Sequence, residues 1–131
     1  MFLTKECDYA IRIVRELADM EMKPVKMICE RELIPRPFAY KILKRLADAG
    51  IVSAHRGASG GYRLVQGPDS LTLYQIVSAV DSRLFLYECL QPGYSCPHNS
   101  NGKFCGVHRE LLCVQKLLVD ALSDKNINNI I

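Results

Sequence analysis

Apolar residues in the first third of the chain recur with the period of an α-helix. After Thr4, a residue type favoured at helix N-caps, they fall at positions 7, 10, 11, 14, 17 and 18, the spacing of one helical face. This predicts a first helix that ends between residues 19 and 22. The same periodicity predicts a second helix over 25–33 and a third over 36–49, ended by Gly50. Pro35 and Pro37 lie where that third helix starts, a place at which proline is tolerated.

The period changes after Gly50 to one typical of strands. Residues 51–56 and 61–65 predict two short strands, and the glycine-rich sequence 57–60 predicts the turn between them. Three short helices followed by a hairpin is the order of a winged helix-turn-helix. We therefore predict a mainly α fold with a small β-hairpin wing.

The second half predicts a helix that follows Thr72 and ends near residue 81, an irregular stretch over 90–104, and a last helix over about 105–123. Apolar residues on this last helix form a narrow seam typical of a dimerisation helix: Val107, Leu111, Val114, Leu118 and Ala121, widened by Leu112, Leu117 and Leu122. Packing against the helix's own domain is an alternative, and both can hold. The asparagine-rich tail over 125–131 is predicted to fray.

These elements divide the chain into four parts. Residues 1–66 form the winged helix-turn-helix, 67–88 a connecting helix and linker, 89–108 a cysteine-rich loop, and 105–131 the long C-terminal dimerisation helix with its tail. The 131 residues suit one ordinary domain with a small appendage.

Charge is distributed unevenly along the chain. Residues 1–66 carry 12 Lys and Arg against 8 Asp and Glu, whereas residues 67–131 carry 5 against 6. A basic first half suits a polyanion such as DNA, although many unrelated domains carry a similar excess. With no apolar run long enough for a membrane span and no signal-peptide pattern at the start, we expect a cytoplasmic protein without a membrane partner.

The predicted third helix has two distinct faces. One is apolar: Phe38, Ala39, Ile42, Leu43 and Leu46. The other carries Pro37, Tyr40, Lys41 and Lys44, with Arg36 and Arg45 beside it. This face suits a major groove, with Tyr40 and Lys41 at base edges and Lys44 at a phosphate. A merely solvated helix face is the alternative.

The predicted wing adds a second DNA contact. Arg56 stands beside a tip formed by Gly57, Ala58, Ser59 and Gly60. A glycine-rich tip lets the backbone approach a ligand closely, and an arginine there can enter a narrow minor groove. Ordinary surface charge is the alternative for Arg56.

Six cysteines without an export signal indicate metal or thiol chemistry rather than disulfides. Cys89, Cys96, Cys105 and His108 follow one another with 6, 8 and 2 residues between them, and could hold an iron–sulfur cluster or zinc, or remain free. His98 could also coordinate, whereas Cys7, Cys29 and Cys113 are predicted to pack. Catalysis by a Cys–His pair is disfavoured, because the cysteines lie in an irregular segment and no oxyanion-type loop is evident.

Three segments resemble the IscR/NsrR family of winged-helix iron–sulfur regulators, which includes cysteine-metabolism and iron-responsive repressors. They are Leu3-Thr4-Lys5-x-x-Asp8-Tyr9-Ala10-x-Arg12, Leu43-x-x-Leu46-x-x-Ala49-Gly50-Ile51-Val52 and His55-Arg56-Gly57-x-x-Gly60-Gly61-Tyr62-x-Leu64. Residues 71–80 and the cysteine loop extend the resemblance over essentially the whole chain. It implies a homodimer on a palindromic operator, with each third helix in a major groove and Arg56 in a minor groove.

The resemblance also implies a cluster held by Cys89, Cys96 and Cys105, with His108 as fourth ligand to a 2Fe–2S cluster. Asp8 is the alternative fourth ligand, by likeness to the nitric-oxide-sensing branch with its 4Fe–4S cluster. The cysteine spacings are longer than the family's, and the reading face differs from that of the best-known member. We expect a regulator that senses cluster status, redox or nitric oxide. The alternative is a cluster-free regulator of the same fold, controlled by cysteine oxidation or a partner protein.

Overall fold

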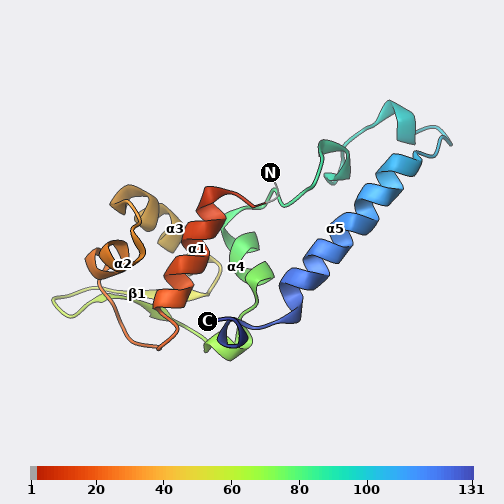
Figure 1. Cartoon of the computed structure of the whole chain (residues 1–131). Coiled ribbons are helices and arrows are strands. Elements are labelled where there is room, and N and C mark those ends of the chain that lie inside the picture. The colour runs from red at the N-terminus through yellow and green to blue at the C-terminus, as the bar shows by residue number, and fades with distance from the viewer. Residues whose placement is uncertain (1–2) are drawn as a thin grey trace.

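The computed structural model describes residues 3–131 and shows a helical body from which one long helix stands apart (Figure 1). The body contains α1 (Lys5–Glu16), α2 (Val25–Glu32), α3 (Arg36–Asp48) and α4 (Leu73–Val80). Thr4 caps α1 by accepting a hydrogen bond from the Cys7 amide, as predicted. α1 ends at Glu16, earlier than predicted, because residues 17–19 form a turn rather than another helical turn.

α2 and α3 form the helix-turn-helix. Leu33 adopts a left-handed conformation (φ 54°) and ends α2, and Pro37 lies in the first turn of α3. Gly50 follows α3 with φ 75°, the left-handed geometry that favours glycine at a helix end. The predicted apolar face of α3 is buried in the common core except for Phe38, which remains 47% exposed beside the ring of Tyr9.

The hairpin pairs β1 (Val52–His55) with β2 (Gly61–Leu64) in antiparallel register, Val52 opposite Leu64. It is tied to the body through the loop before α2, where Lys23 and Tyr62 exchange two backbone hydrogen bonds of 2.9 Å. A Cβ at Gly61 would collide with the Lys23 carbonyl. Gly61 is therefore required by the close approach of wing and loop.

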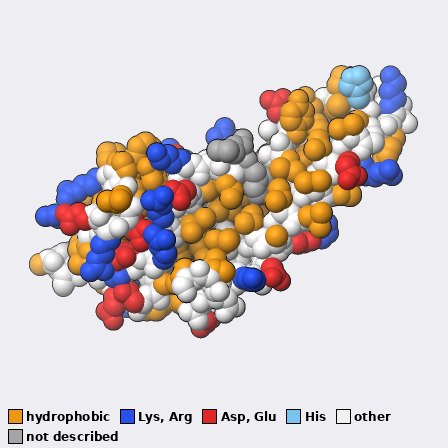
Figure 2. All heavy atoms as spheres, in the orientation of Figure 1, with side chains coloured by type: hydrophobic (Ala, Val, Ile, Leu, Met, Phe, Trp, Pro, Cys, Tyr) orange, Lys and Arg blue, Asp and Glu red, His pale blue; other side chains and the backbone are white. Residues whose placement is uncertain are grey.

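α5 (Gly106–Asp124) is the last helix, and the irregular segment before it contains two short 3₁₀ turns, η2 (Glu88–Leu90) and η3 (Pro97–Asn99); a further turn, η1 (Pro68–Ser70), precedes α4. No residue of α5 is fully buried, although Gln115 on this helix accepts a hydrogen bond from the Leu86 amide. Apolar side chains gather along α5 and on the neighbouring body (Figure 2). Within residues 3–131, no helix is both long enough and apolar enough to cross a membrane.

The predicted frayed tail is wrong. Residues 127–129 form the turn η4 (Ile127–Asn129), and Asn126 caps it by accepting from the Asn129 amide. Ile127 is 1% exposed and belongs to the main core. A single apolar side chain among asparagines was enough to dock this segment on the body, and sequence patterning over seven residues gave no sign of it.

Candidate nucleic-acid interface and cysteine loop

The predicted reading face of α3 lies on the surface. Arg36, Pro37, Tyr40, Lys41 and Lys44 are all exposed. Prolines and an arginine start the helix, and the buried residues of the opposite face fix its orientation on the body. The structure thus brings together the residues that sequence patterning assigned to one surface, and their contact with DNA stays a prediction.

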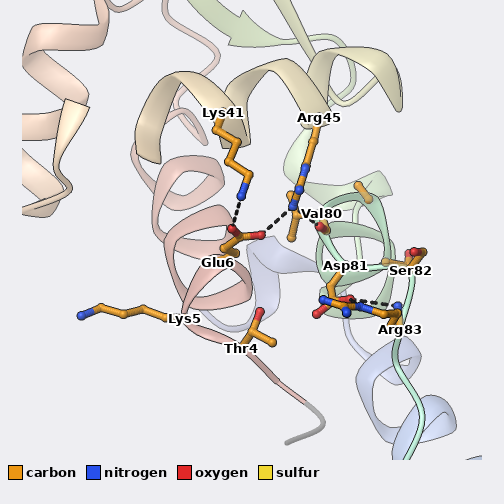
Figure 3. A pocket seen from close by; sticks show the side chains of 11 residues that line it. Thr4, Lys5, Glu6, Lys41, Arg45, Val80, Asp81, Ser82 and Arg83 are labelled. Atoms are coloured by element: carbon orange, nitrogen blue, oxygen red, sulfur yellow. Dashed lines mark hydrogen bonds and ion pairs between the residues drawn. The ribbon is translucent and has the colours of Figure 1, made fainter. Parts of the chain in front are cut away.

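Two basic side chains of α3 converge on one carboxylate of α1 (Figure 3). Lys41 Nζ lies 2.6 Å from Glu6 Oε1, and Arg45 Nη1 lies 2.6 Å from Glu6 Oε2 and from the Val80 carbonyl oxygen. Hydrogen bonding from Lys41 and Arg45 outweighs desolvation and lowers the pKa of Glu6 below its ordinary value. Lys41 is thereby paired with α1, although 51% of its side chain remains exposed.

This carboxylate lies in an open groove between α1, α3 and the end of α4, with a volume of about 740 Å³. Lys5 and Arg83 stand on its rim (Figure 3). Sequence reasoning missed Glu6, because residues 6, 41 and 45 are too far apart in the chain for their pairing to be visible as a helical spacing.

The wing tip exposes Arg56, Gly57 and Ser59, as a DNA contact requires. Arg56 has no ion-pair or hydrogen-bond partner among the described residues 3–131. Gly57 has φ +116° and open space around it, whereas a Cβ at Gly60 would collide with the His55 carbonyl. The turn itself therefore requires Gly60, and Gly57 is the tip residue whose backbone is open to a ligand.

The three loop cysteines are half-buried. Cys89 is in η2, which packs against α5, and Cys96 and Cys105 are the N-caps of η3 and α5. Cys105 Sγ accepts a hydrogen bond from the His108 amide at 3.5 Å, so this pair shares the N-terminal end of α5. Across residues 3–131 the chain forms no group of three or more potential metal ligands.

One buried atom in this loop lacks a partner. His108 Nδ1 is shielded from solvent and makes no hydrogen bond within the described chain. An unpaired buried ring nitrogen costs free energy unless something binds it. A metal-ligating histidine meets that need, so the donor set Cys89, Cys96, Cys105 and His108 fits an iron–sulfur group chemically, although the structure does not gather it.

Asp8, the alternative fourth ligand, is engaged elsewhere. Both of its oxygens are bonded by Arg12, at 3.1 and 3.0 Å, on the exposed side of α1. Its position in the first turn also complements the helix dipole. Coordination by Asp8 would require this pair to open.

The other cysteines behave differently from one another. Cys7 and Cys29 are buried, as predicted, and burial raises the pKa of the Cys29 thiol. The prediction that Cys113 packs is wrong within the described chain, because Cys113 is exposed on α5. His98 is exposed and lies in η3, outside any ligand group.

Comparison with known proteins identifies the family. A family model described as "Rrf2: Iron-dependent Transcriptional regulator" matches residues 3–131. The putative HTH-type transcriptional regulator slr0846 of Synechocystis is 42% identical over 87 residues, 64% of this chain and 59% of that protein. IscR of Aliivibrio salmonicida is 32% identical over 68% of this chain and 55% of its own length. NsrR of Bacillus subtilis is 30% identical over 68% of this chain and 63% of its own length.

Each of these three matches spans less than two thirds of the relative's length. Among solved structures, T. potens IscR superposes with a TM-score of 0.76 at 20% identity, over 98% of this chain and 84% of that one. CymR, the global cysteine regulator of B. subtilis, gives 0.77 at 21%, over 98% and 94%. These likenesses confirm the winged-helix fold, and the names of the relatives confirm a regulator rather than an enzyme. The chain therefore belongs to the Rrf2 family of transcriptional regulators.

Proposed function

We propose that this regulator binds a double-stranded DNA operator as a homodimer and senses iron–sulfur cluster status, redox or nitric oxide. The ligands would be Cys89, Cys96, Cys105 and His108, with 2Fe–2S favoured over 4Fe–4S. The observation that carries the sensing function is the buried, unpartnered Nδ1 of His108, a residue whose backbone amide donates a hydrogen bond to the Cys105 thiol. A bound cluster would supply reversible redox and nitric-oxide chemistry.

DNA binding is supported by the surface that α3 and the wing share. The exposed face of α3 would enter a major groove, and Arg56 on the wing would reach the adjacent minor groove. Arg36 and Lys44 would contact phosphates, as exposed basic side chains beside a reading face do.

Dimerisation is supported by the uncovered apolar face of α5. Val107 and Leu117 are 69% and 68% exposed, and Val114 and Leu118 lie on the same side of the helix. Contiguous apolar surface of this kind marks an interface. A second copy is the partner that fits, since a regulator with one reading helix per chain needs two copies to bind a palindromic site.

The loop and the dimer helix are connected directly. Cys105 caps α5, and η2 with Cys89 packs against the same helix. Ordering of the loop would therefore bias the position of α5, and with it the separation of the two reading helices.

The test is anaerobic purification followed by an absorption spectrum with iron and sulfide analysis. We expect visible bands with about two iron and two sulfide per chain. Cys96→Ser should abolish them, and Cys113→Ser is the matched control that should retain them. Four iron per chain would shift the assignment to 4Fe–4S with Asp8, and a colourless protein that resists reconstitution would refute cluster sensing.

A cluster-free regulator is the second candidate. It is favoured by the separation of the three cysteines within the described chain and by the exposure of Cys113. In that case thiol oxidation or a partner protein would control DNA binding. Operator affinity that falls on oxidation of the colourless protein would support it.

A further inference from the structure

Both lysines of α3 are paired with carboxylates, which leaves Arg36 as the unpaired cation at the start of this helix in the described chain. Lys41 lies in the first half of the helix, but its ammonium is held by Glu6 on α1, at 2.6 Å. Figure 3 shows the Lys41 side chain running toward α1 and away from the outer face of α3. Lys44 pairs with Asp48 at 3.2 Å, and both are well exposed, so this pair is weak and lies one turn further along.

Apart from Lys41 and Lys44, the exposed residues in the first half of α3 are mostly apolar. Pro37 is exposed, and Tyr40, which is 53% exposed, lies three residues further along on the same side. Apolar side chains gather over this end of the body, beside basic ones (Figure 2). Arg36 is the one cation in the first turn.

Base edges are contacted by the N-terminal residues of a recognition helix. Among the major-groove edges, the thymine 5-methyl group is the one that apolar side chains recognise, whereas guanine is read by a free Arg or Lys. Tyr40 and Pro37 present apolar surface at this position, and the adjacent Lys41 is paired with the carboxylate of Glu6.

We propose that Tyr40 and Pro37 determine operator specificity by contact with thymine methyl groups, so that the base pairs facing the start of α3 are A·T. This inference rests on the proposed DNA binding through α3. Glu6 is a positioning residue in this scheme, because it keeps the Lys41 ammonium away from those bases.

The experiment uses the full-length protein and duplexes selected from a random library by repeated rounds of binding. In the selected half-sites, thymines are then replaced one at a time by deoxyuridine, which lacks only the methyl group. We expect A·T pairs at two neighbouring positions of each half-site. Removal of one methyl there should weaken binding about fourfold, the value of burying one methyl-sized group.

Tyr40→Ala should bind the uridine and thymine duplexes equally at one of the two positions and keep the difference at the position that Pro37 contacts, whereas Tyr40→Phe, which keeps the ring, should preserve the difference at both. Because Tyr40 is exposed, both variants should fold, and circular dichroism checks this. Selected half-sites with G·C at these positions, or equal binding of both duplexes by the unmodified protein, would overturn the proposal while leaving DNA binding intact. Failure to select any sequence would refute the DNA-binding function and this inference with it.

Discussion

Ile127 donates its backbone N–H to the carbonyl oxygen of Leu71 at 2.7 Å and buries its side chain in the same core. Leu71 precedes α4, and Ile127 follows α5 by three residues, so the contact fastens the base of α5 to the body. The tail therefore anchors the C-terminal end of α5 to the body.

Ile127→Ala should destabilise the protein by about 2–4 kcal/mol, since it empties a fully buried site. Denaturant unfolding of the apo protein measures the change. Ile130→Ala, at a 43% exposed position in the same tail, is the control and should change stability by less than about 0.5 kcal/mol. Equal effects of the two substitutions would contradict the docking of Ile127.

Sequence patterning predicted the helices, the hairpin and the surface of α3, because each depends on a local period or on a turn residue. It did not predict the Ile127–Leu71 contact or the pairing of Glu6 with Lys41, since both join residues at least 35 positions apart. Phe38 was assigned to the apolar face but is half exposed, because its place on α3 lies at the edge of that face. The residue types predicted the candidate ligands of the cysteine loop. The irregular segments between them do not determine how the ligand side chains converge.

Stability should fall at acidic pH through a group of charges at the end of α1. Lys23, 6% exposed, is paired with Glu16 at 3.1 Å and Asp19 at 2.7 Å. Burial alone would raise the pKa of Glu16, but hydrogen bonds from Arg31 and Lys23 outweigh it, and the pKa is lowered. The hydrogen bond from Lys23 likewise lowers the pKa of Asp19. Because the folded-state values lie below the unfolded ones, this stabilisation is present at neutral pH and lost as the pH falls below 4.5.

Denaturant midpoints measured from pH 7 to pH 3 test this loss. Glu16→Gln should cost about 2–3 kcal/mol at pH 7, less than a fully broken buried pair because Asp19 remains paired with Lys23, and should flatten the acid-side fall. Glu21→Gln, at an exposed position, is the control and should leave the curve unchanged. A Glu16→Gln curve as steep as that of the unmodified protein would contradict the assignment.

Glu6→Gln should make DNA binding less selective. It removes the charge that pairs with Lys41 and so leaves one more cation next to the reading face, whereas Arg45 keeps its hydrogen bond to the Val80 carbonyl oxygen. We expect tighter binding to random-sequence DNA and a salt dependence steeper by about one unit of slope for each new phosphate contact. Titrations at several salt concentrations measure the slope. Asp48→Asn, which frees only the weakly paired Lys44, is the comparison and should have the smaller effect.

Arg56→Ala should weaken operator binding by about tenfold or more, the loss of one specific charged contact, without changing the absorption spectrum. Arg63→Ala, an exposed arginine on β2 away from the turn, is the matched control. Fluorescence anisotropy with the selected duplex provides the affinities. An Arg56 variant that binds as tightly as the unmodified protein would remove the wing from the interface.

Leu117→Glu should convert the proposed dimer to a monomer. Leu117 is 68% exposed on α5, so a carboxylate there costs the single chain almost nothing, but in a symmetric interface it would bury two like charges. Sedimentation analysis over a range of concentrations should show half the mass, and operator affinity should fall because one reading helix binds alone. Lys116→Glu changes charge at the neighbouring exposed position outside the apolar seam, and it should leave the dimer intact. If Leu117→Glu also remains dimeric, α5 is not the helix through which two copies meet.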